Sequence, residues 1–251
     1  MGESVQSVNR ALTILEILRK QPNGLGVTEI SNQLGIAKST SHRLLSSLMQ
    51  HGFVQKDTSS GNYRLGLALL HLGSEVSKSF DVRRVALPFL NQLVTETGET
   101  AHLAIYDQGE IVYIDKLESP ASLRMYSQIG GRAPAHCTGL GKAILSFQVE
   151  KEIDWLIENK GLKQFTPTTL TSKEALMKAL TEVKRAGVAF DEEEHEKGIR
   201  CAAAPIFNHN NEVVAGISVA GPTTRISKAE LTKLANQVKD VARQISRQMG
   251  R

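Results

Sequence analysis

The segment VTEISNQLGIAKSTSHRLLSSLMQH, at Val27–His51, constrains the fold more than any other part of the sequence. Its first part predicts a short helix with Thr28 as the N-cap, because Ile30 and Leu34 lie four residues apart on one helical face. Gly35 is placed to end that helix, since glycine adopts a positive φ at low cost. The segment is therefore expected to form two short helices joined by a tight turn.

The second helix of this segment, which starts near Lys38, has one apolar and one polar side. Leu45 and Leu48 fall within the apolar arc of the helical wheel, whereas serine, histidine and arginine side chains lie opposite. A helix-turn-helix has this layout, and its second helix enters the major groove of DNA, where such polar groups bond base edges and phosphates. The residues of the segment expected to contact DNA are Thr28, Lys38, Ser39, Thr40, His42, Arg43 and Ser46.

A β-hairpin is expected directly after this helix. Phe53–Lys56 and Tyr63–Leu65 have the alternation of short strands, and Asp57–Asn62 between them is rich in turn-forming residues. Such a hairpin is the wing of a winged helix. Lys56 and Arg64 on its strands are placed to contact phosphates.

A further helix is predicted upstream, where Val8, Leu12, Leu15 and Leu18 recur at helical spacing. Arg10 lies outside this apolar series and is another candidate DNA contact. The alternative is an ordinary small helical domain with an exposed serine-rich helix. DNA binding is favoured over it, because helix, turn, helix and hairpin occur together and in this order.

Length and composition indicate about two domains. The chain has 251 residues, of which 41% are hydrophobic, enough for substantial cores. It has no apolar run long enough to span a membrane and no apolar signal-peptide core at its start, and its two cysteines lie far apart. We therefore expect a cytoplasmic protein without a disulfide framework and without a membrane partner.

The expected domains are a winged helix-turn-helix at 1–66, a linker helix at 67–80 and an effector-binding domain at 81–251. The net charge of +4 is concentrated near the start, since residues 1–80 hold eight basic and five acidic side chains. This excess is modest, so tight binding is expected to need two copies on one operator. The apolar side of the linker helix either packs within one chain or helps two chains dimerise, and the second interpretation is favoured.

From residue 81 onward the pattern predicts an α+β domain. Two of its strand candidates are joined by Gln108 and Gly109, a tight hairpin signal, and Pro88 is expected to kink a helix or to start its second part. Strand pairs with short turns favour an antiparallel sheet covered by helices, as in a sensor domain. The expected strands are Thr100–Asp107, Ile111–Glu118, Ser122–Gln128, Arg200–Phe207 and Val213–Ala220. The expected helices are Val82–Thr97, Thr138–Phe147, Glu150–Asn159, Lys173–Ala186 and Ser227–Met249.

The run TGLGKA at Thr138–Ala143 is similar to a phosphate-binding loop but does not complete one. His136 stands at the first glycine position of a Walker A motif and Ala143 at its hydroxyl position. The dinucleotide fingerprint also fails, because Ile144 occupies its third glycine position. A glycine-bearing helix N-terminus remains, which suits an anion but is weak evidence by itself.

Two further kinds of site stay open as alternatives. A cysteine-dependent enzyme fused to a DNA-binding module would use Cys201 as nucleophile and His136 or His195 as base, although a cysteine entering a strand is more often a small buried residue. A metal-sensing regulator would need several separate loops to converge, and adjacent His136 and Cys137 are poorly spaced for one ion. Its candidate ligands are His136, Cys137, Glu194, His195 and Cys201. The acidic run Asp191–Glu194 is interpreted as a solvated loop.

Six stretches of the sequence match one known family in order and cover nearly the whole chain. They are SVNRALTILEIL at Ser7–Leu18, Thr28–Phe53, YRLG at Tyr63–Gly66, GRAPAHCTGLGKAIL at Gly131–Leu145, FDEEEHEKGIRC at Phe190–Cys201, and Ala204–Pro222. In these stretches the chain resembles IclR-type transcriptional regulators. The resemblance implies a winged helix, a linker helix and a GAF-like effector-binding domain.

The resemblance also implies a function. The expected protein is a repressor that binds double-stranded operator DNA as a homodimer or homotetramer, under the control of a small organic acid. It implies no enzyme activity, and neither a metal ion nor a cofactor is expected. It implies effector contacts at Gly139, Leu140, Asp191, Cys201, Ser218 and Ala220. With Gly141 at the anion-binding helix start and Ile199 beside Cys201, the expected effector-binding positions are Gly139, Leu140, Gly141, Asp191, Ile199, Cys201, Ser218 and Ala220.

Two of these positions depart from the pattern of the family. Ser218 matches one hydroxyl, but Ala220 stands where a second serine can occur, so one hydrogen bond to the effector is missing. Leu140 is bulkier than the alanine found there in some members. These departures disfavour a glyoxylate- or pyruvate-like ligand and allow a less polar or differently shaped one. In the expected mechanism, an anion bound at Gly139–Gly141 and Ser218 shifts the placement of two winged helices through the linker helix.

Overall fold

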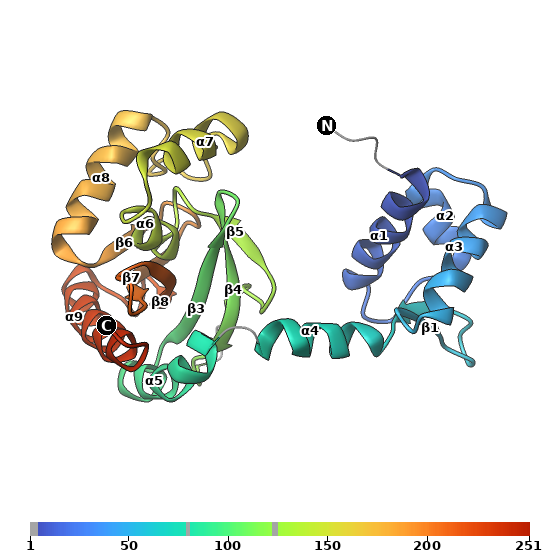
Figure 1. The fold of residues 1–251 in the computed structure, drawn as a ribbon, viewed down its shortest axis with the longest axis horizontal. Helices are drawn as coiled ribbons and strands as arrows, with labels where there is room; N and C mark the ends of the chain where they lie inside the picture. The colour runs from blue at the N-terminus through green and yellow to red at the C-terminus, as the bar shows by residue number, and fades with distance from the viewer. Residues whose placement is uncertain (1–4, 79–80, 122–124) are drawn as a thin grey trace. The chain divides into compact units, whose positions relative to one another are not determined.

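The fold is described from a computed structural model that places residues 5–78, 81–121 and 125–251. The chain forms two compact units, Met1–Ser79 and Phe80–Arg251 (Figure 1), and each is described by itself.

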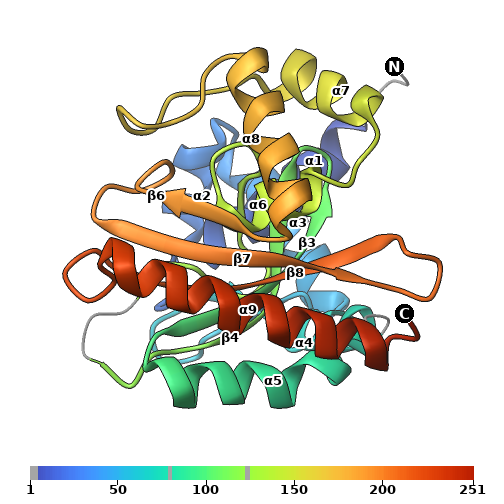
Figure 2. The ribbon, with the colours of Figure 1, turned by 90° about the vertical axis from the view of Figure 1, so that its left-hand side faces the viewer.

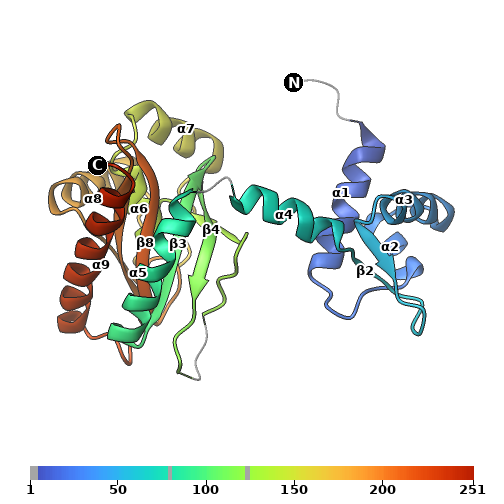
Figure 3. The ribbon, with the colours of Figure 1, turned by 60° about the horizontal axis from the view of Figure 1, so that its bottom comes forward.

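The first unit is three helices followed by a two-stranded hairpin and a further helix (Figure 3). Its core is built from Ile14, Leu18, Ile30 and Leu45, all almost fully buried, with Tyr63 closing the hairpin side. The predicted helix-turn-helix and wing are confirmed. The elements are α1 (Gln6–Arg19), α2 (Val27–Leu34), α3 (Lys38–Gln50), β1 (Val54–Lys56), β2 (Tyr63–Leu65) and α4 (Ala68–Lys78).

The turn between α2 and α3 forms as predicted, but the start of α2 differs. Gly35 has φ 63°, a left-handed conformation that ends α2 at low cost for glycine. The expectation that Thr28 caps α2 is wrong, because the N-cap is Gly26. The Gly26 N–H donates to the Glu29 carboxylate at 2.9 Å, which satisfies a free donor at the helix start.

The buried face of α1 also differs from the expected one. Val8 and Leu12 are 53% and 57% exposed, whereas Ile14 and Leu18 are buried. Leu18 is buried and Leu15 partly buried, as the predicted series requires, but the centre of the buried face lies nearer Ile14 than Val8 and Leu12. The apolar side chains of Val8 and Leu12 therefore face away from the core of their own unit.

The second unit is a six-stranded antiparallel sheet with the strand order β5-β4-β3-β8-β7-β6. This confirms the predicted α+β class. Its strands are β3 (Thr100–Asp107), β4 (Glu110–Leu117), β5 (Arg132–Pro134), β6 (Ala189–Glu192), β7 (Ile199–Phe207) and β8 (Val213–Pro222). Its helices are α5 (Asp81–Thr97), α6 (Gly139–Leu145), α7 (Glu150–Lys160), α8 (Lys173–Ala186) and α9 (Lys228–Gln248).

Helices cover both faces of this sheet (Figures 1 and 2). α5 and α9 lie side by side on one face, where Leu90 and Val238 pack against strand residues such as Ile217. α6 and α8 cover the other face, and every residue of α6 is buried. The short α6 is thus held between the sheet and α8, and it is the element that positions the site described below.

The β3–β4 hairpin forms as predicted, with Gln108 and Gly109 at φ 49° and 82°. The expected strand Ser122–Gln128 is not confirmed. Residues 122–124 lie outside the described residues, and residues 125–128 have no regular structure. β4 pairs with β3 on one side, and its partner on the other side is β5. β5 is only three residues long, too short for a periodic pattern to show in the sequence.

Helix ends in the second unit follow the capping residues of the sequence. α8 begins after Ser172, whose hydroxyl accepts the Ala175 N–H, and it ends at Gly187 with φ 72°. α9 begins after Ser227 in the same way. α5 continues as one helix through Pro88, which therefore does not start a separate helix.

Candidate functional site

The polar side of α3 is open to solvent. Lys38, Ser39, His42, Arg43 and Ser46 are exposed, and Thr40 is half-buried. The opposite side is anchored, since Ser41, Leu45 and Leu48 are buried in the core of the unit. The arrangement presents hydroxyl, imidazole and guanidinium groups on one rigid helix face, which is the chemistry that reads base edges in a major groove.

The hairpin that follows this helix carries two exposed basic side chains, Lys56 and Arg64. The Lys56 ammonium lies 5.4 Å from the centre of the Tyr63 ring. Arg64 lies 3.9 Å from the Asp57 carboxylate, and hydrogen bonds from Ser59 hold the pKa of Asp57 down to about 2. Of the remaining candidates, Thr28 is exposed on α2 and Arg10 is half-buried on α1.

The second unit encloses a cavity of about 210 Å³ between the sheet and the start of α6. We call it the effector cavity, after the effector-binding positions that the sequence predicts. All six strands of the sheet, the start of α6 and two loops contribute to its wall, and the lining mixes polar with apolar groups. Its lining is His102, Tyr113, Met125, Tyr126, Ser127, Arg132, Ala133, Thr138, Gly139, Leu140, Asp191, His195, Glu196, Ile199, Cys201, Ser218 and Ala220.

Seven of the eight predicted effector positions line this cavity, although they come from four separate segments of the chain. They are Gly139, Leu140, Asp191, Ile199, Cys201, Ser218 and Ala220. The eighth, Gly141, is not brought to the cavity. Its N–H donates to the Thr138 hydroxyl at 3.1 Å, and a Cβ at this position would lie 2.1 Å from the Ala135 carbonyl oxygen. Gly141 therefore allows close packing against Ala135, and its N–H is not available to bind an anion.

Sequence reasoning missed several residues of the wall, above all His102. This side chain lies in the middle of the sheet, opposite Ser218 on β8 and Lys116 on β4, and its Nε2 is 2.7 Å from the Ser127 hydroxyl. Burial lowers its pKa to about 3, so the imidazole is neutral at physiological pH. The sequence predicts the strand β3, but it does not show which face of that strand borders a cavity.

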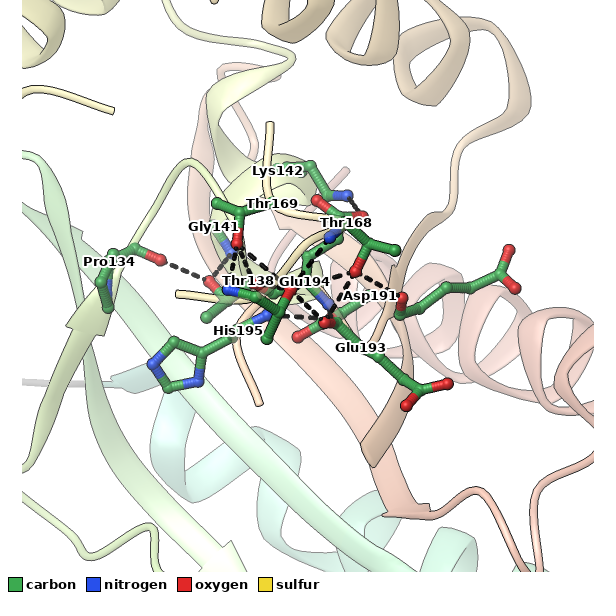
Figure 4. Close-up of polar contacts among 12 residues, drawn as sticks. Pro134, Thr138, Gly141, Lys142, Thr168, Thr169, Asp191, Glu193, Glu194 and His195 are labelled. Atoms are coloured by element: carbon green, nitrogen blue, oxygen red, sulfur yellow. Dashed lines mark hydrogen bonds and ion pairs between the residues drawn. The ribbon is translucent and has the colours of Figure 1, made fainter. Parts of the chain in front are cut away.

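The carboxylate of Asp191 is buried in the cavity wall (Figure 4). Its Oδ1 accepts the Glu194 N–H at 2.7 Å and the His195 N–H at 3.4 Å. Burial is the largest influence on this group and raises its pKa to about 7. The interpretation of Asp191–Glu194 as a solvated loop is wrong for Asp191 and Glu194, because both are buried. Asp191 and Glu192 end β6, and only Glu192 of the run is exposed.

The turn after β6 is held by an ion pair to α6 and by hydrogen bonds from the segment before α8 (Figure 4). The Lys142 ammonium on α6 pairs with the Glu194 carboxylate, and both side chains are nearly buried. Hydroxyls of the segment before α8 hold its backbone, since Thr169 donates to the Glu194 carbonyl and Thr166 to the Glu193 carbonyl, both at 2.6 Å. These contacts fix the turn whose residues His195 and Glu196 form one side of the cavity.

The structure does not assemble the proposed metal ligands. Within residues 5–78, 81–121 and 125–251, no three histidine, cysteine or carboxylate side chains are grouped to hold an ion. The His136 ring lies 3.0 Å from the Lys163 carbonyl, to which it can donate. Burial raises the pKa of the Cys137 and Cys201 thiols to about 12, which leaves neither as a ready nucleophile at neutral pH.

Family models match both units of the chain. Residues 7–58 match the IclR helix-turn-helix domain, and residues 74–247 match the bacterial transcriptional regulator IclR C-terminal domain. The chain belongs to the IclR family of transcriptional regulators. This IclR-family protein is therefore a DNA-binding transcription regulator and not an enzyme, and the cysteine-enzyme alternative is set aside.

Relatives match along nearly the full length. The HTH-type transcriptional regulator XynR of Escherichia coli K12 is 41% identical over 98% of either chain. The transcriptional repressor IclR of the same strain is 35% identical over 96% of this chain and 89% of its own. The crystal structure of Thermotoga maritima IclR is 34% identical, has a TM-score of 0.84, and covers 98% of this chain and 99% of its own. Among the described residues of this IclR-family regulator, no helix is long and apolar enough to cross a membrane.

Proposed function

We propose that this regulator is a repressor whose binding to operator DNA is controlled by a small organic acid held in the effector cavity. The observation that carries the proposal is the convergence of seven candidate positions, from four separate segments of the chain, on one cavity of about 210 Å³. Small-molecule sites are usually concave and combine apolar surface with convergent polar groups, as this cavity does. The relative named as a transcriptional repressor supports repression as the mode of action.

The cavity offers a limited set of polar contacts to such an acid. The Ser218 hydroxyl is buried and has no hydrogen-bond partner among the described residues except the weak sulfur of Cys201. Gly139 and Leu140 border the cavity at the start of α6. Arg132 supplies a guanidinium at the exposed edge, but Asp107 and Glu110 already pair with it. The effector is therefore held mainly by hydrogen bonds and apolar contact.

Control of DNA binding requires that the effector bind two arrangements of the protein unequally. A ligand shifts an equilibrium only by its difference in affinity for the two states. In the proposed organisation, residues 1–66 contact DNA, residues 67–80 link, and residues 81–251 sense the effector. Since the matched family is bacterial and acts on DNA, the proposed place of action is the cytoplasm.

The DNA contacts are proposed on the exposed polar face of α3 and on the hairpin. Basic groups there would bind phosphates, and the exposed Arg43 would read a base edge. The proposed contacts are Arg10, Thr28, Lys38, Ser39, Thr40, His42, Arg43, Ser46, Lys56 and Arg64.

The proposed assembly is a homodimer or homotetramer. Leu12 on α1 and Leu70 on α4 are large apolar side chains that are exposed in the first unit. Val8 and Leu67 are exposed in the same way. Apolar surface of this kind commonly marks an interface between chains, and two copies would double the modest positive charge that faces one operator.

The test combines a binding screen with an operator-binding assay. Sugar acids, short keto acids and aromatic acids are screened for thermal stabilisation, where an effector at about 100 times its Kd adds about 2.7 kcal/mol. Each stabilising acid is then tested for its effect on operator affinity. Ser218→Ala is expected to weaken acid binding by about 1 kcal/mol, whereas Ser146→Ala, buried at the far end of α6, is expected to leave it unchanged. Acids that bind without changing operator affinity would disprove the proposed control.

A further inference from the structure

A second cavity of about 280 Å³ lies in the same unit, and no step of the proposed function uses it. It is bordered by the end of α8, by the C-terminal half of α9 and Arg251 after it, by Phe147 shortly after α6, and by the end of β7. We call it the basic cavity. Its lining includes five cationic side chains and, within the described residues, no aspartate or glutamate: Lys184, Arg185, Lys239, Arg243 and Arg251.

The basic cavity is separate from the effector cavity. α6 begins at the effector cavity with Gly139, and the chain reaches the basic cavity at Phe147 directly after the helix ends. β7 likewise passes from Cys201 at the effector cavity to Phe207 at the basic cavity. The two cavities therefore lie at opposite ends of the same helix and strand.

Few negative groups offset the five cations. The Lys239 ammonium donates to the Ala186 carbonyl at 2.5 Å, and Arg243 pairs with Asp240 at 3.3 Å on an exposed surface. Lys184 faces the Phe147 ring at 5.7 Å, and Arg251 lies 3.9 Å from the centre of the Phe207 ring. Aromatic rings position these two cations but carry no net charge, so an excess of positive charge remains around the cavity.

An ordinary explanation accounts for part of this charge. Basic residues are favourable in the last turn of a helix, where they offset the dipole and bond the free carbonyls. Lys184 and Arg185 occupy that place in α8, and Lys239 bonds the terminal carbonyl. Arg243 and Arg251 do not belong to α8, however, and they approach the same cavity from α9 and the residues after it.

We propose that the basic cavity binds a small phosphate-bearing anion. A phosphate group carries about −1.5 to −2 charge near pH 7 and three acceptor oxygens. Arginine matches such a group with two parallel hydrogen bonds and lysine with a point charge. The edge-to-face pair of Phe147 and Phe207, with ring centres 4.9 Å apart, forms an apolar base for the rest of the ligand. Carboxylates carry less charge and would use fewer of the converging cations.

Pyrophosphate is the probe for the test, with sulfate at matched ionic strength as the reference anion, and binding to the full chain is measured by calorimetry. Arg185→Gln with Arg243→Gln is expected to weaken pyrophosphate binding at least about tenfold, the scale of one lost charge-assisted contact. The matched control is Lys233→Gln with Arg247→Gln, which removes the same charge from exposed positions of α9 outside the cavity. This control is expected to bind as the wild type does.

Other outcomes would overturn the proposal. Equal weakening in the two double variants would show a response to net charge alone, and equal affinity for sulfate and pyrophosphate would show nonspecific anion binding. Loss of pyrophosphate binding in Arg43→Gln would place the anion on the DNA-binding surface instead. Absence of pyrophosphate binding to the wild type would also contradict the proposal. Thermal melting of each variant checks that its fold is intact, and Lys184→Gln, a single exposed change, repeats the test if a double variant unfolds.

Discussion

The ammonium of Lys142 and the carboxylate of Glu194 form an ion pair that is almost fully withdrawn from solvent. The pair joins the buried helix α6 to the turn that follows β6 (Figure 4). Two residues from this turn, His195 and Glu196, line the effector cavity. The ion pair therefore holds one wall of the cavity against the helix that forms another.

Removal of one partner is expected to destabilise the protein strongly. Glu194→Gln leaves the Lys142 ammonium buried without a counter-charge, which typically costs about 3–5 kcal/mol. Lys173→Ala is the matched control, because its pair with Asp154 is about 40% exposed on both sides and such pairs contribute at most about 1 kcal/mol. Urea unfolding of the two variants measures the difference. Similar losses of unfolding free energy in both would contradict the importance of burial at Lys142.

Asp191 is expected to make stability fall as pH rises. Its pKa is about 7 in the folded protein against 3.8 for an ordinary aspartate, so the folded state binds the proton more tightly. Between about pH 4 and pH 7 the folded state therefore holds a proton that the unfolded state has lost, and stability decreases across this window. The stabilising contribution is complete below pH 4 and absent above pH 7.

Asp191→Asn tests this dependence, because an asparagine oxygen can still accept the N–H groups of Glu194 and His195. The free energy of unfolding is measured for both proteins at pH 5 and pH 8. Relative to the wild type, the variant is expected to be more stable at pH 8 than at pH 5. A stability difference that stays constant with pH would mean that the Asp191 carboxyl titrates near its ordinary pKa.

Local features of this fold could be predicted from the sequence because their causes are local. α8 has the predicted bounds, since Ser172 caps its start and Gly187 adopts the left-handed conformation after its end. The α2–α3 turn at Gly35 and the β3–β4 turn at Gly109 follow from the same property of glycine.

The parts that could not be predicted depend on contacts between distant segments. β6 is short and acidic, and it becomes a strand only because β7 supplies its hydrogen bonds. The cavity position of His102 depends on which face of β3 meets α6, and the Lys142–Glu194 pair joins residues 52 positions apart. The positions that the family resemblance implied do converge on the cavity. Gly141, which is expected from the sequence to bind an anion through its N–H, does not line the cavity, and its lack of a side chain lets Ala135 approach closely.

Arg43 on α3 is expected to contribute to DNA binding. If Arg43 reads a guanine, Arg43→Ala should weaken operator binding by about 1–3 kcal/mol with little effect on random DNA. Arg19→Ala removes the same charge from α1, where Arg19 pairs with Glu16, and it is expected to have a small effect. Fluorescence anisotropy at fixed salt measures both. An equal loss on operator and random DNA would instead make Arg43 a phosphate contact.

Two glycines in helices are expected to respond to alanine in opposite directions. Gly141→Ala places a Cβ 2.1 Å from the Ala135 carbonyl oxygen, so the backbone must shift, and overpacking of this kind costs about 1–3 kcal/mol or more. Gly73→Ala in α4 meets no atom within 4 Å and is expected to stabilise the helix by about 0.5–1 kcal/mol. Thermal melting of both variants checks the contrast. A Gly141→Ala protein as stable as the wild type would show that α6 can move away from Ala135.

The two thiols are expected to react slowly in the folded protein. Burial raises the pKa of Cys137 and Cys201 to about 12, so the thiolate fraction at pH 7.5 is very small in both. The thiolate is the reactive form, and access to each thiol is also restricted. Iodoacetamide labelling followed by mass spectrometry measures both rates, with the urea-unfolded protein as the reference for accessible thiols. Fast labelling of Cys201 in the folded protein would contradict this prediction and would mean that its thiol is activated. Cys201 would then have a chemical role beyond lining the cavity.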